Sequence, residues 1–336
     1  EYGVIRLIHP DIEKLDAIEK AILDQSYPPP ADIPAPAEPD LAPLADAVNK
    51  EKTAEALRYY ATALAMWQPE WRLTEASLML QWALRPEPDH AATHFYAGVV
   101  YRKRYDSPNR KPDDFQRAVY HWQRALELAP NNYIYRRRIQ QYGPRLDKPY
   151  PFYDWIAEAR KAIEARGETP YPLPIEPYGA ELAAPQDTFA TVEATAPDPK
   201  GAITRDEAQL IQLETTAVPT KIKAGEAIRV HIILRPQATA YWNNEAEGTV
   251  LWVNAPAGWQ IDRPLQTLPL PNSETDDAPR IFEFEARSPD NAQGTTEITF
   301  YVLYYVCEQK DGVCLYRRQD GAVTIEVSAA TAQSNR

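Results

Sequence analysis

The spacing of apolar residues changes once along this chain, and that change constrains the fold more than any other feature. From about Asp46 to Gly143, apolar side chains recur every three or four positions, which is typical of amphipathic helices. From about Ala208 onward they alternate with polar ones, as in AIRVHIILRP and TTEITFYVLYYVC, which indicates β-strands. The length of 336 residues is too great for one ordinary domain. We therefore expect a multi-domain α + β protein.

Clusters of proline mark the boundaries between these parts. The chain has 32 prolines against 12 glycines, and many of them lie in YPPPADIPAPAEPDLAPL and ETPYPLPIEPYGAEL. Proline fixes φ and lacks the N–H donor, so such stretches favour extended spacers over helices or central strands. We predict a linker at 25–45, a helical domain at 46–166 whose last helix is closed by Gly167, an extended proline- and aromatic-rich arm at 167–207 and a β domain at 208–330.

The helical part contains an internal repeat. LQWALRPEPDHAATHFYAGVVY aligns with WQRALELAPNNYIYRRRIQQY at an offset of 42 residues, which pairs Ala83 with Ala125 and Pro88 with Pro130. A tetratricopeptide repeat has about 34 residues. The segment YDSPNRKPDD supplies the extra residues, and we expect it to form a loop between two helices.

Residues 50–143 resemble the tetratricopeptide family. The small, aromatic and proline positions of its pattern are filled by Gly98, Tyr101, Ala118, Trp122, Ala125 and Pro130. The resemblance implies stacked helix pairs that bind protein partners. Tyr101 and Trp122 are therefore candidate partner-binding residues.

The only two cysteines, Cys307 and Cys314, flank the short segment EQKDGV between two predicted strands. Asp311-Gly312 is a strong signal for a hairpin turn. Directly opposed residues of such a hairpin lie about 4.5 Å apart between Cα atoms, and a disulfide accepts about 4.4–6.8 Å. Three alternatives remain open: a structural disulfide, an exchangeable disulfide, and two free thiols. Nearby basic residues that would lower a thiol pKa are Lys310, Arg317 and Arg318.

The stretch YYVCEQKDGVCLYRR, together with AYWNNEAEGTVLWVNAPAGWQI, resembles the N-terminal domain of the periplasmic thiol:disulfide interchange reductase. The resemblance covers residues 208–328 and implies an immunoglobulin-like antiparallel β-sandwich. The resemblance implies that Cys307 and Cys314 are the catalytic redox pair. It also implies that the partner is a thioredoxin-like protein. Tyr241 and Trp242 are candidates for an aromatic shield that contacts this partner. We identify no counterpart of the family's acidic-aromatic cap loop, so a domain that keeps the disulfide without exchange activity is the alternative.

The first 24 residues, which include GVIRLIHPDIEKLDAIEKAI, resemble the closing strand and helix of a peroxiredoxin- or thioredoxin-like domain. They are interpreted as a remnant of such a domain. The chain starts without Met or an apolar leader, and we expect it to be a processed or partial product. An oxidising, extracytoplasmic compartment (periplasmic or cell-surface) suits a short-loop disulfide.

Charge and motifs argue against several other functions. The formal net charge of −12 makes nucleic acid a poor partner. No run of 18 apolar residues is present, so any association with a membrane complex would be peripheral. No phosphate-binding, dinucleotide or nucleophile-elbow motif indicates a cofactor. His90 and His94 are four residues apart, but without the acid of the HExxH motif we expect no metal there.

Two functions are consistent with these residues. The first is an extracytoplasmic thiol–disulfide exchange protein with a protein-binding helical domain, acting through Cys307 and Cys314. The second is a non-catalytic scaffold or accessory subunit of a larger assembly, in which the same two cysteines form a purely structural disulfide.

Overall fold

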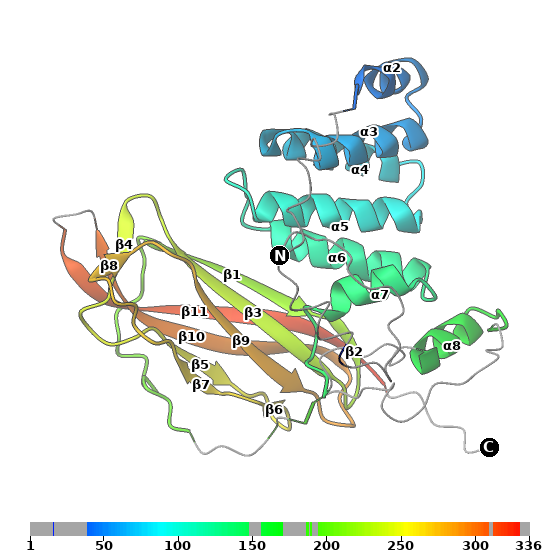
Figure 1. The fold of residues 1–336 in the computed structure, drawn as a ribbon. Helices are drawn as coiled ribbons and strands as arrows, with labels where there is room; N and C mark the ends of the chain where they lie inside the picture. Colours follow the sequence, from blue (N-terminus) through cyan, green and yellow to red (C-terminus); the bar gives the residue numbers. More distant parts are fainter. Residues whose placement is uncertain are drawn as a thin grey trace. The chain divides into compact units, whose positions relative to one another are not determined.

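The computed structural model (Figure 1) describes residue 16 and residues 39–147, 156–170, 186, 187, 189, 194–308 and 312–329. The chain divides into two compact units, 1–43 and 44–336, and nearly all of the described residues belong to the second. Helices before a β-rich second half confirm the mixed α + β class. The predicted redoxin-like remnant at 1–24 lies outside the described residues, apart from Asp16.

The described helices follow one another from Ala42 to Ala165. They are α2 (Ala42–Glu51), α3 (Ala54–Trp67), the short 3₁₀ helix η1 (Glu70–Arg72), α4 (Leu73–Leu84), α5 (Ala91–Tyr105), α6 (Asp114–Leu128), α7 (Tyr133–Gln140) and α8 (Ile156–Ala165). The carboxylate of Asp40 accepts the Ala42 N–H at 2.9 Å. Helix therefore begins inside the segment predicted to be a linker, whose residues 25–38 lie outside the described residues.

Polar side chains and glycine set the ends of several helices. The Thr53 hydroxyl accepts the Ala56 N–H at 3.1 Å at the start of α3, and Asn132 accepts two N–H groups of α7. Gly167 has φ +77°, a conformation that glycine adopts without steric cost. The N–H of Glu168 then bonds back to the Ile163 carbonyl at 3.2 Å, so α8 ends where the sequence predicted.

Close approach of α5 to α6 organises the helical part, whose helices lie side by side in Figure 1. Trp122 is completely buried, and a Cβ built on Gly98 would lie 2.4 Å from its Nε1 atom. Only a glycine at position 98 leaves room for the indole. The loop predicted between these helices is confirmed, because α5 ends at Tyr105 and α6 begins at Asp114.

A buried ion pair fastens this loop to the helices on either side. The Arg104 guanidinium donates to both carboxylate oxygens of Asp114, and its Nη1 also donates to the Ser77 hydroxyl of α4 at 2.9 Å. Asp114 in turn accepts the Lys111 N–H at 2.8 Å. A buried charge must be paired to be tolerated, so this network makes α4, α5 and α6 depend on one another.

A second buried polar contact joins His94 of α5 to His121 of α6. Burial lowers the pKa of both imidazoles, that of His121 to about 3, so both are neutral at neutral pH. His94 Nε2 lies 2.9 Å from the Pro88 carbonyl oxygen, which can only accept, so this nitrogen donates. His94 Nδ1 then accepts from His121 Nδ1–H at 2.9 Å. His90 instead caps α5 by accepting the Thr93 N–H at 3.2 Å.

The β region consists of two sheets. The four-stranded sheet has the order β1 (Ile211–Val218), β3 (Ala227–Pro236), β9 (Arg280–Arg287), β6 (Gln260–Ile261). The seven-stranded sheet has the order β2 (Lys221–Lys223), β11 (Cys314–Ser328), β10 (Gly294–Glu308), β4 (Ala240–Asn243), β8 (Thr275–Asp276), with β5 (Val250–Asn254) on β10 and β7 (Leu265–Thr267) on β5. The strands predicted from alternation at 227–236 and 295–307 are confirmed.

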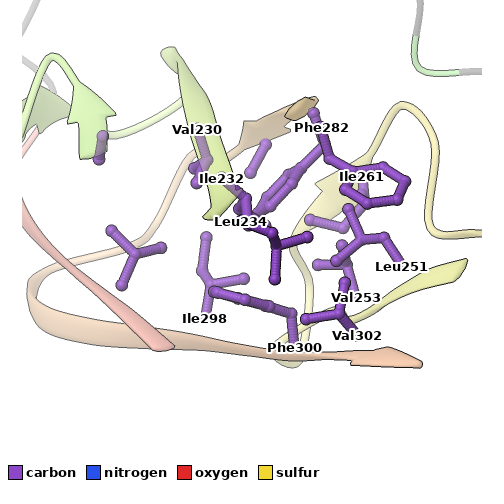
Figure 2. Close-up of a cluster of buried hydrophobic side chains, with 14 of the residues drawn as sticks. Val230, Ile232, Leu234, Leu251, Val253, Ile261, Phe282, Ile298, Phe300 and Val302 are labelled. Atoms are coloured by element: carbon purple, nitrogen blue, oxygen red, sulfur yellow. The ribbon is translucent and has the colours of Figure 1, made fainter. Parts of the chain in front are cut away.

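One hydrophobic core lies between the two sheets (Figure 2). One wall comes from the four-stranded sheet, with Val230, Ile232, Leu234, Ile261 and Phe282, and the other comes from β5 and β10, with Leu251, Val253, Ile298, Phe300 and Val302. These residues alternate along their strands, so one face of each sheet is apolar and turned inward.

The predicted antiparallel sandwich also contains one parallel pair of strands. Among the described strand pairs, β2 and β11 run parallel, with Glu326 opposite Lys221 and Ser328 opposite Lys223. The chain passes from β1 in one sheet to β2 in the other through only Pro219 and Thr220. That connection is too short for a crossover within one sheet, and it brings β2 against the end of β11 in the same direction.

Substitution of Gly98 by Ala should destabilise the helical part by roughly 1–3 kcal/mol, because the added methyl group collides with a fully buried indole. Gly143→Ala is the matched control, since its nearest neighbouring atom would be 3.6 Å away. Urea unfolding monitored by tryptophan fluorescence measures both. Equal stability of the two variants would show that Trp122 has room to move.

The histidine pair should make the protein less stable in mild acid. The unfolded imidazole binds a proton below about pH 6.5, whereas folded His121 resists protonation down to about pH 3, so stability falls as the pH drops below 6.5. At pH 5 one such histidine accounts for about 2 kcal/mol. His121→Phe should therefore reduce the loss of unfolding free energy between pH 7.5 and pH 5 by about that amount. An unchanged loss of unfolding free energy in the His121→Phe variant would contradict this role of His121.

Candidate functional site

The two cysteines form the last residue pair of the longest strand ladder in the described part of the chain. Strands β10 and β11 pair from Gly294 opposite Val327 to Cys307 opposite Cys314. The cysteine Cα atoms are 4.0 Å apart and the sulfurs form a disulfide bond. The prediction that a hairpin brings the two cysteines face to face is confirmed, and the alternative of two free thiols is wrong. The predicted turn residue Asp311 lies outside the described residues.

The disulfide lies on the outer face of the seven-stranded sheet, defined as the face turned away from the common core. Val302, Tyr304 and Val306 belong to that core. Since side chains alternate along a strand, Cys307 and Tyr305 are on the other face. The cysteine side chains are therefore supported from beneath by the core and are approached from outside the sandwich.

The two half-cystines differ in their access to solvent. Cys307 is only 1% exposed, because it lies between β11 and β4, where Tyr241 is its neighbour in register. Cys314 is exposed, and so is Val313, of which 72% is accessible. An incoming group reaches Cys314 first.

Two tyrosines that were not among the predicted site residues stand beside the disulfide. Tyr305 is opposite Tyr316 in the ladder, and their rings stack with centroids 4.4 Å apart. Each lies two positions from a cysteine, so strand alternation alone places both on the outer face. The alternation of side chains along the strands was therefore the sequence signal that could have identified these two tyrosines as site residues.

On the inner face of β10, the side chain of Tyr304 makes a buried hydrogen bond. The Tyr304 hydroxyl donates to Asp206 at 2.8 Å, and burial raises the pKa of this tyrosine above its usual value. Asp206 also accepts the N–H groups of Leu210 and Ile211. The segment that leads into β1 is thereby tied to β10 under the disulfide.

Of the four predicted partner-binding residues, three need correction. Trp122 and Trp242 are 0% exposed and Tyr101 is 1% exposed. Trp242 packs edge-on against Tyr304 in the core of the sandwich, and its Nε1 donates to the Ala278 carbonyl at 2.8 Å. These three side chains fill the cores of their own regions and have no surface to offer a partner. Tyr241, half-buried next to Cys307, remains a candidate.

The basic residues close to the cysteines in sequence are not all near the sulfurs. Arg318 donates to Asp198 at 2.9 Å and to Asp320 at 2.8 Å, and its guanidinium lies 3.8 Å from the Tyr301 ring centroid. Arg317 is opposite Tyr304 in the ladder and so belongs to the inner face. Lys310 lies outside the described residues. The expectation that Arg318 activates a thiol is not supported, since its charge is already paired.

Neither a metal centre nor a membrane span accompanies the disulfide in the described part of the chain. No group of three or more His, Cys, Asp or Glu side chains there is placed to hold a metal ion. Within the same residues, no helix has the length and apolar character needed to cross a bilayer.

No protein-family model matches the chain, and no curated protein matches it. Among solved structures, the N-terminal periplasmic domain of ScsB from Proteus mirabilis aligns at 12% identity over 40% of this chain and 49% of that one, with a TM-score of 0.21. The sporulation control protein Spo0M from Bacillus subtilis aligns at 13% identity over 36% and 50%, with a TM-score of 0.19. Each alignment spans about half of the other protein.

The alkylpurine DNA glycosylase AlkC from Pseudomonas fluorescens aligns over 85% of this chain and 75% of its own, at 12% identity and a TM-score of 0.21. TM-scores this low do not establish a shared fold, and no function follows from them. The site must be interpreted from its own geometry.

After reduction, Cys314 should be alkylated faster than Cys307, because only Cys314 is exposed. A short pulse of iodoacetamide followed by peptide mass spectrometry should show at least about a tenfold preference, since the thiolate must be both formed and reached. The same pulse on urea-unfolded protein serves as the control and should label both equally. Equal labelling of the folded protein would contradict the asymmetry.

Proposed function

We propose that this protein carries out thiol–disulfide exchange in an extracytoplasmic compartment, through an immunoglobulin-like domain that bears the Cys307–Cys314 disulfide. The observation that carries the proposal is the unequal exposure of the two half-cystines at the open end of the β10–β11 ladder. A disulfide with one reachable sulfur and one protected sulfur can be attacked at a single position.

The exchange begins when a partner thiolate attacks the Sγ atom of Cys314. A new S–S bond forms between partner and Cys314, the bond to Cys307 breaks, and Cys307 leaves as a thiolate. A second partner thiolate then attacks the partner's sulfur in the mixed disulfide and releases Cys314. The protein disulfide is reduced to two thiols and the partner dithiol is oxidised, so the two electrons balance.

The strand ladder supports this chemistry by holding the reduced thiols close together. Backbone pairing of β10 with β11 sets Cys307 opposite Cys314 at the end of a ladder that extends to Gly294 and Val327. Thiols kept in register in this way re-form the disulfide when an oxidant arrives, without a search through other conformations. A thioredoxin-like protein is the partner class that fits this cycle.

The helical part, resembling tetratricopeptide repeats, would bind a protein partner. Large apolar side chains are exposed on α3, η1 and α4, where Met66 is 66% and Trp71 is 64% exposed and Trp82 is also exposed. Exposed aromatic residues in such numbers are typical of protein interaction surfaces. The same observation favours the alternative function, a non-catalytic scaffold in a larger assembly whose disulfide is purely structural.

The reduction potential of the disulfide separates the two functions. Equilibration with glutathione or dithiothreitol buffers should give a value above about −300 mV if the pair exchanges, and a lower value if it is structural. Alkylation and mass shift measure the reduced fraction. A potential well below this limit would assign the protein to the scaffold function.

Single cysteine variants test the direction of attack. The partner used is a thioredoxin-like protein that lacks its second cysteine and carries its remaining sulfur as a mixed disulfide with 5-thio-2-nitrobenzoate. Cys307→Ser leaves the exposed thiol at Cys314, whose thiolate should displace thionitrobenzoate and form a stable mixed disulfide with this partner, since no second thiolate remains to release Cys314. Cys314→Ser leaves only the buried thiol and should trap at least about tenfold less, since access controls exchange. Non-reducing electrophoresis measures the adduct. Equal trapping by both variants would contradict the proposed order of bond exchange.

A further inference from the structure

The edge of β11 beside the disulfide carries backbone groups that point away from the rest of the sheet. The N–H of Arg318 donates to the Thr204 carbonyl at 3.0 Å, and the Arg318 carbonyl accepts the Asp206 N–H at 3.1 Å. The backbone groups of Arg318 are therefore turned away from β10. Since this direction repeats every two residues along a strand, the N–H and C=O groups of Tyr316 and Cys314 point to the same edge.

This edge is open next to the exposed sulfur. Within the described part of the chain, no backbone group beyond β11 bonds to Tyr316 or Cys314 there, and the Tyr316 carbonyl accepts from the Arg317 side chain at 3.2 Å. The short pairing of the chain around Arg205 with β11 is a single bridge to Arg318. Unpaired strand edges are the places where a further extended segment can add to a sheet.

The positions of the two sulfurs make the same edge the direction of attack on Cys314. A thiolate displaces one sulfur of a disulfide from the side opposite the leaving sulfur. For Cys314 the leaving sulfur belongs to Cys307 on β10, so the attacking group comes from the open edge of β11. Attack on Cys307 would have to come from the other side, where Tyr241 of β4 is its neighbour in register.

A strand added to this edge holds a partner cysteine at bonding distance. Neighbouring strands lie about 4.7–4.9 Å apart, and a disulfide accepts Cα separations of about 4.4–6.8 Å. A cysteine opposite Cys314 therefore fits a mixed disulfide without a shift of β11. Tyr316, stacked on Tyr305, lies two residues further along the same face. An apolar side chain of the added strand can pack against it as a cross-strand neighbour.

We propose that a second partner of this disulfide is an extended, cysteine-bearing polypeptide segment that adds as a strand to β11 at Cys314 and Tyr316. The inference rests on the proposed exchange function and names a partner class beside the thioredoxin-like protein. The thiolate of the segment bonds to Cys314 Sγ, and Cys307 leaves as a thiolate. A second substrate thiolate then releases Cys314, so two substrate thiols become a disulfide and the protein disulfide becomes two thiols.

Peptides with one blocked edge test the pairing directly. The probe is an uncharged peptide, Thr-Val-Cys-Val-Thr, blocked at both ends. One derivative is N-methylated on the backbone at Cys and the last Thr, the other at both Val residues, so each lacks the N–H groups of one edge. Each rate of reduction of the oxidised protein is divided by the rate of the same peptide with hydroxyethyl disulfide, which removes intrinsic reactivity. One derivative should match the parent peptide and the other should be about tenfold slower, because only one edge of an added strand faces β11.

Two variants at position 316 test the edge from the side of the protein. Tyr316→Pro removes an N–H that points away from β10, so the ladder keeps its bonds. Tyr316→Ala is the matched control, because it removes the same ring and keeps the N–H. The parent peptide should reduce the proline variant about threefold more slowly than the alanine variant, whereas 2-mercaptoethanol should reduce both at the same rate. The peptide series uses the unaltered protein, so it decides the question even where the proline variant fails to fold.

The outcomes separate strand addition from the exchange function itself. Slowing by one N-methylated derivative alone, together with a slower folded proline variant, supports the inference. Equal rates for all three peptides, equal slowing by both derivatives, or equal peptide rates for the two folded variants overturns it, and reduction by 2-mercaptoethanol leaves the exchange function standing. Failure of 2-mercaptoethanol and of every peptide to reduce the folded protein, while hydroxyethyl disulfide reacts, overturns both.

Discussion

The pairing of β10 with β11 is the constraint on which the rest of the β region depends. The two strands stay in register from Gly294 opposite Val327 to Cys307 opposite Cys314. Because side chains alternate, this one register sends Ile298, Phe300 and Val302 into the core and Cys307 to the outer face. A slip by one residue would exchange the two faces, so burial of the core also fixes the position of the disulfide.

This arrangement explains why the disulfide is free to have a chemical role. It closes a loop with a sequence separation of only 7, which in the chain-entropy model contributes about 2.5 kcal/mol, against about 4.7 for a loop of about 100 residues. The ladder already holds the hairpin, so breaking the bond costs the fold comparatively little. The helical region is held separately, by the Gly98–Trp122 contact and the buried Arg104–Asp114 pair.

Much of the site was predictable from local patterns, and the failed predictions have a common cause. Two cysteines flanking an Asp-Gly turn between alternating strands specify a cross-strand pair, because turn and alternation act over a few residues. The role of the aromatic residues was not predictable in that way. Trp122 and Trp242 were expected at a partner surface but are completely buried. Whether a tryptophan is covered depends on segments distant in sequence, such as α5 over Trp122 and β9 beside Trp242.

The sequence by itself determined the order of helical and β regions, the approximate limits of the long strands, the loop between α5 and α6 and the position of the two cysteines on either side of one hairpin. Each of these follows from periodicity, proline and glycine, or turn chemistry, which act between near neighbours in the chain. Only the tertiary structure decided that Cys314 is exposed while Cys307 is covered, and that Tyr241 is the neighbour of Cys307 on β4. The exposure of a half-cystine depends on residues far apart in sequence, so it is defined only once the sheet has formed.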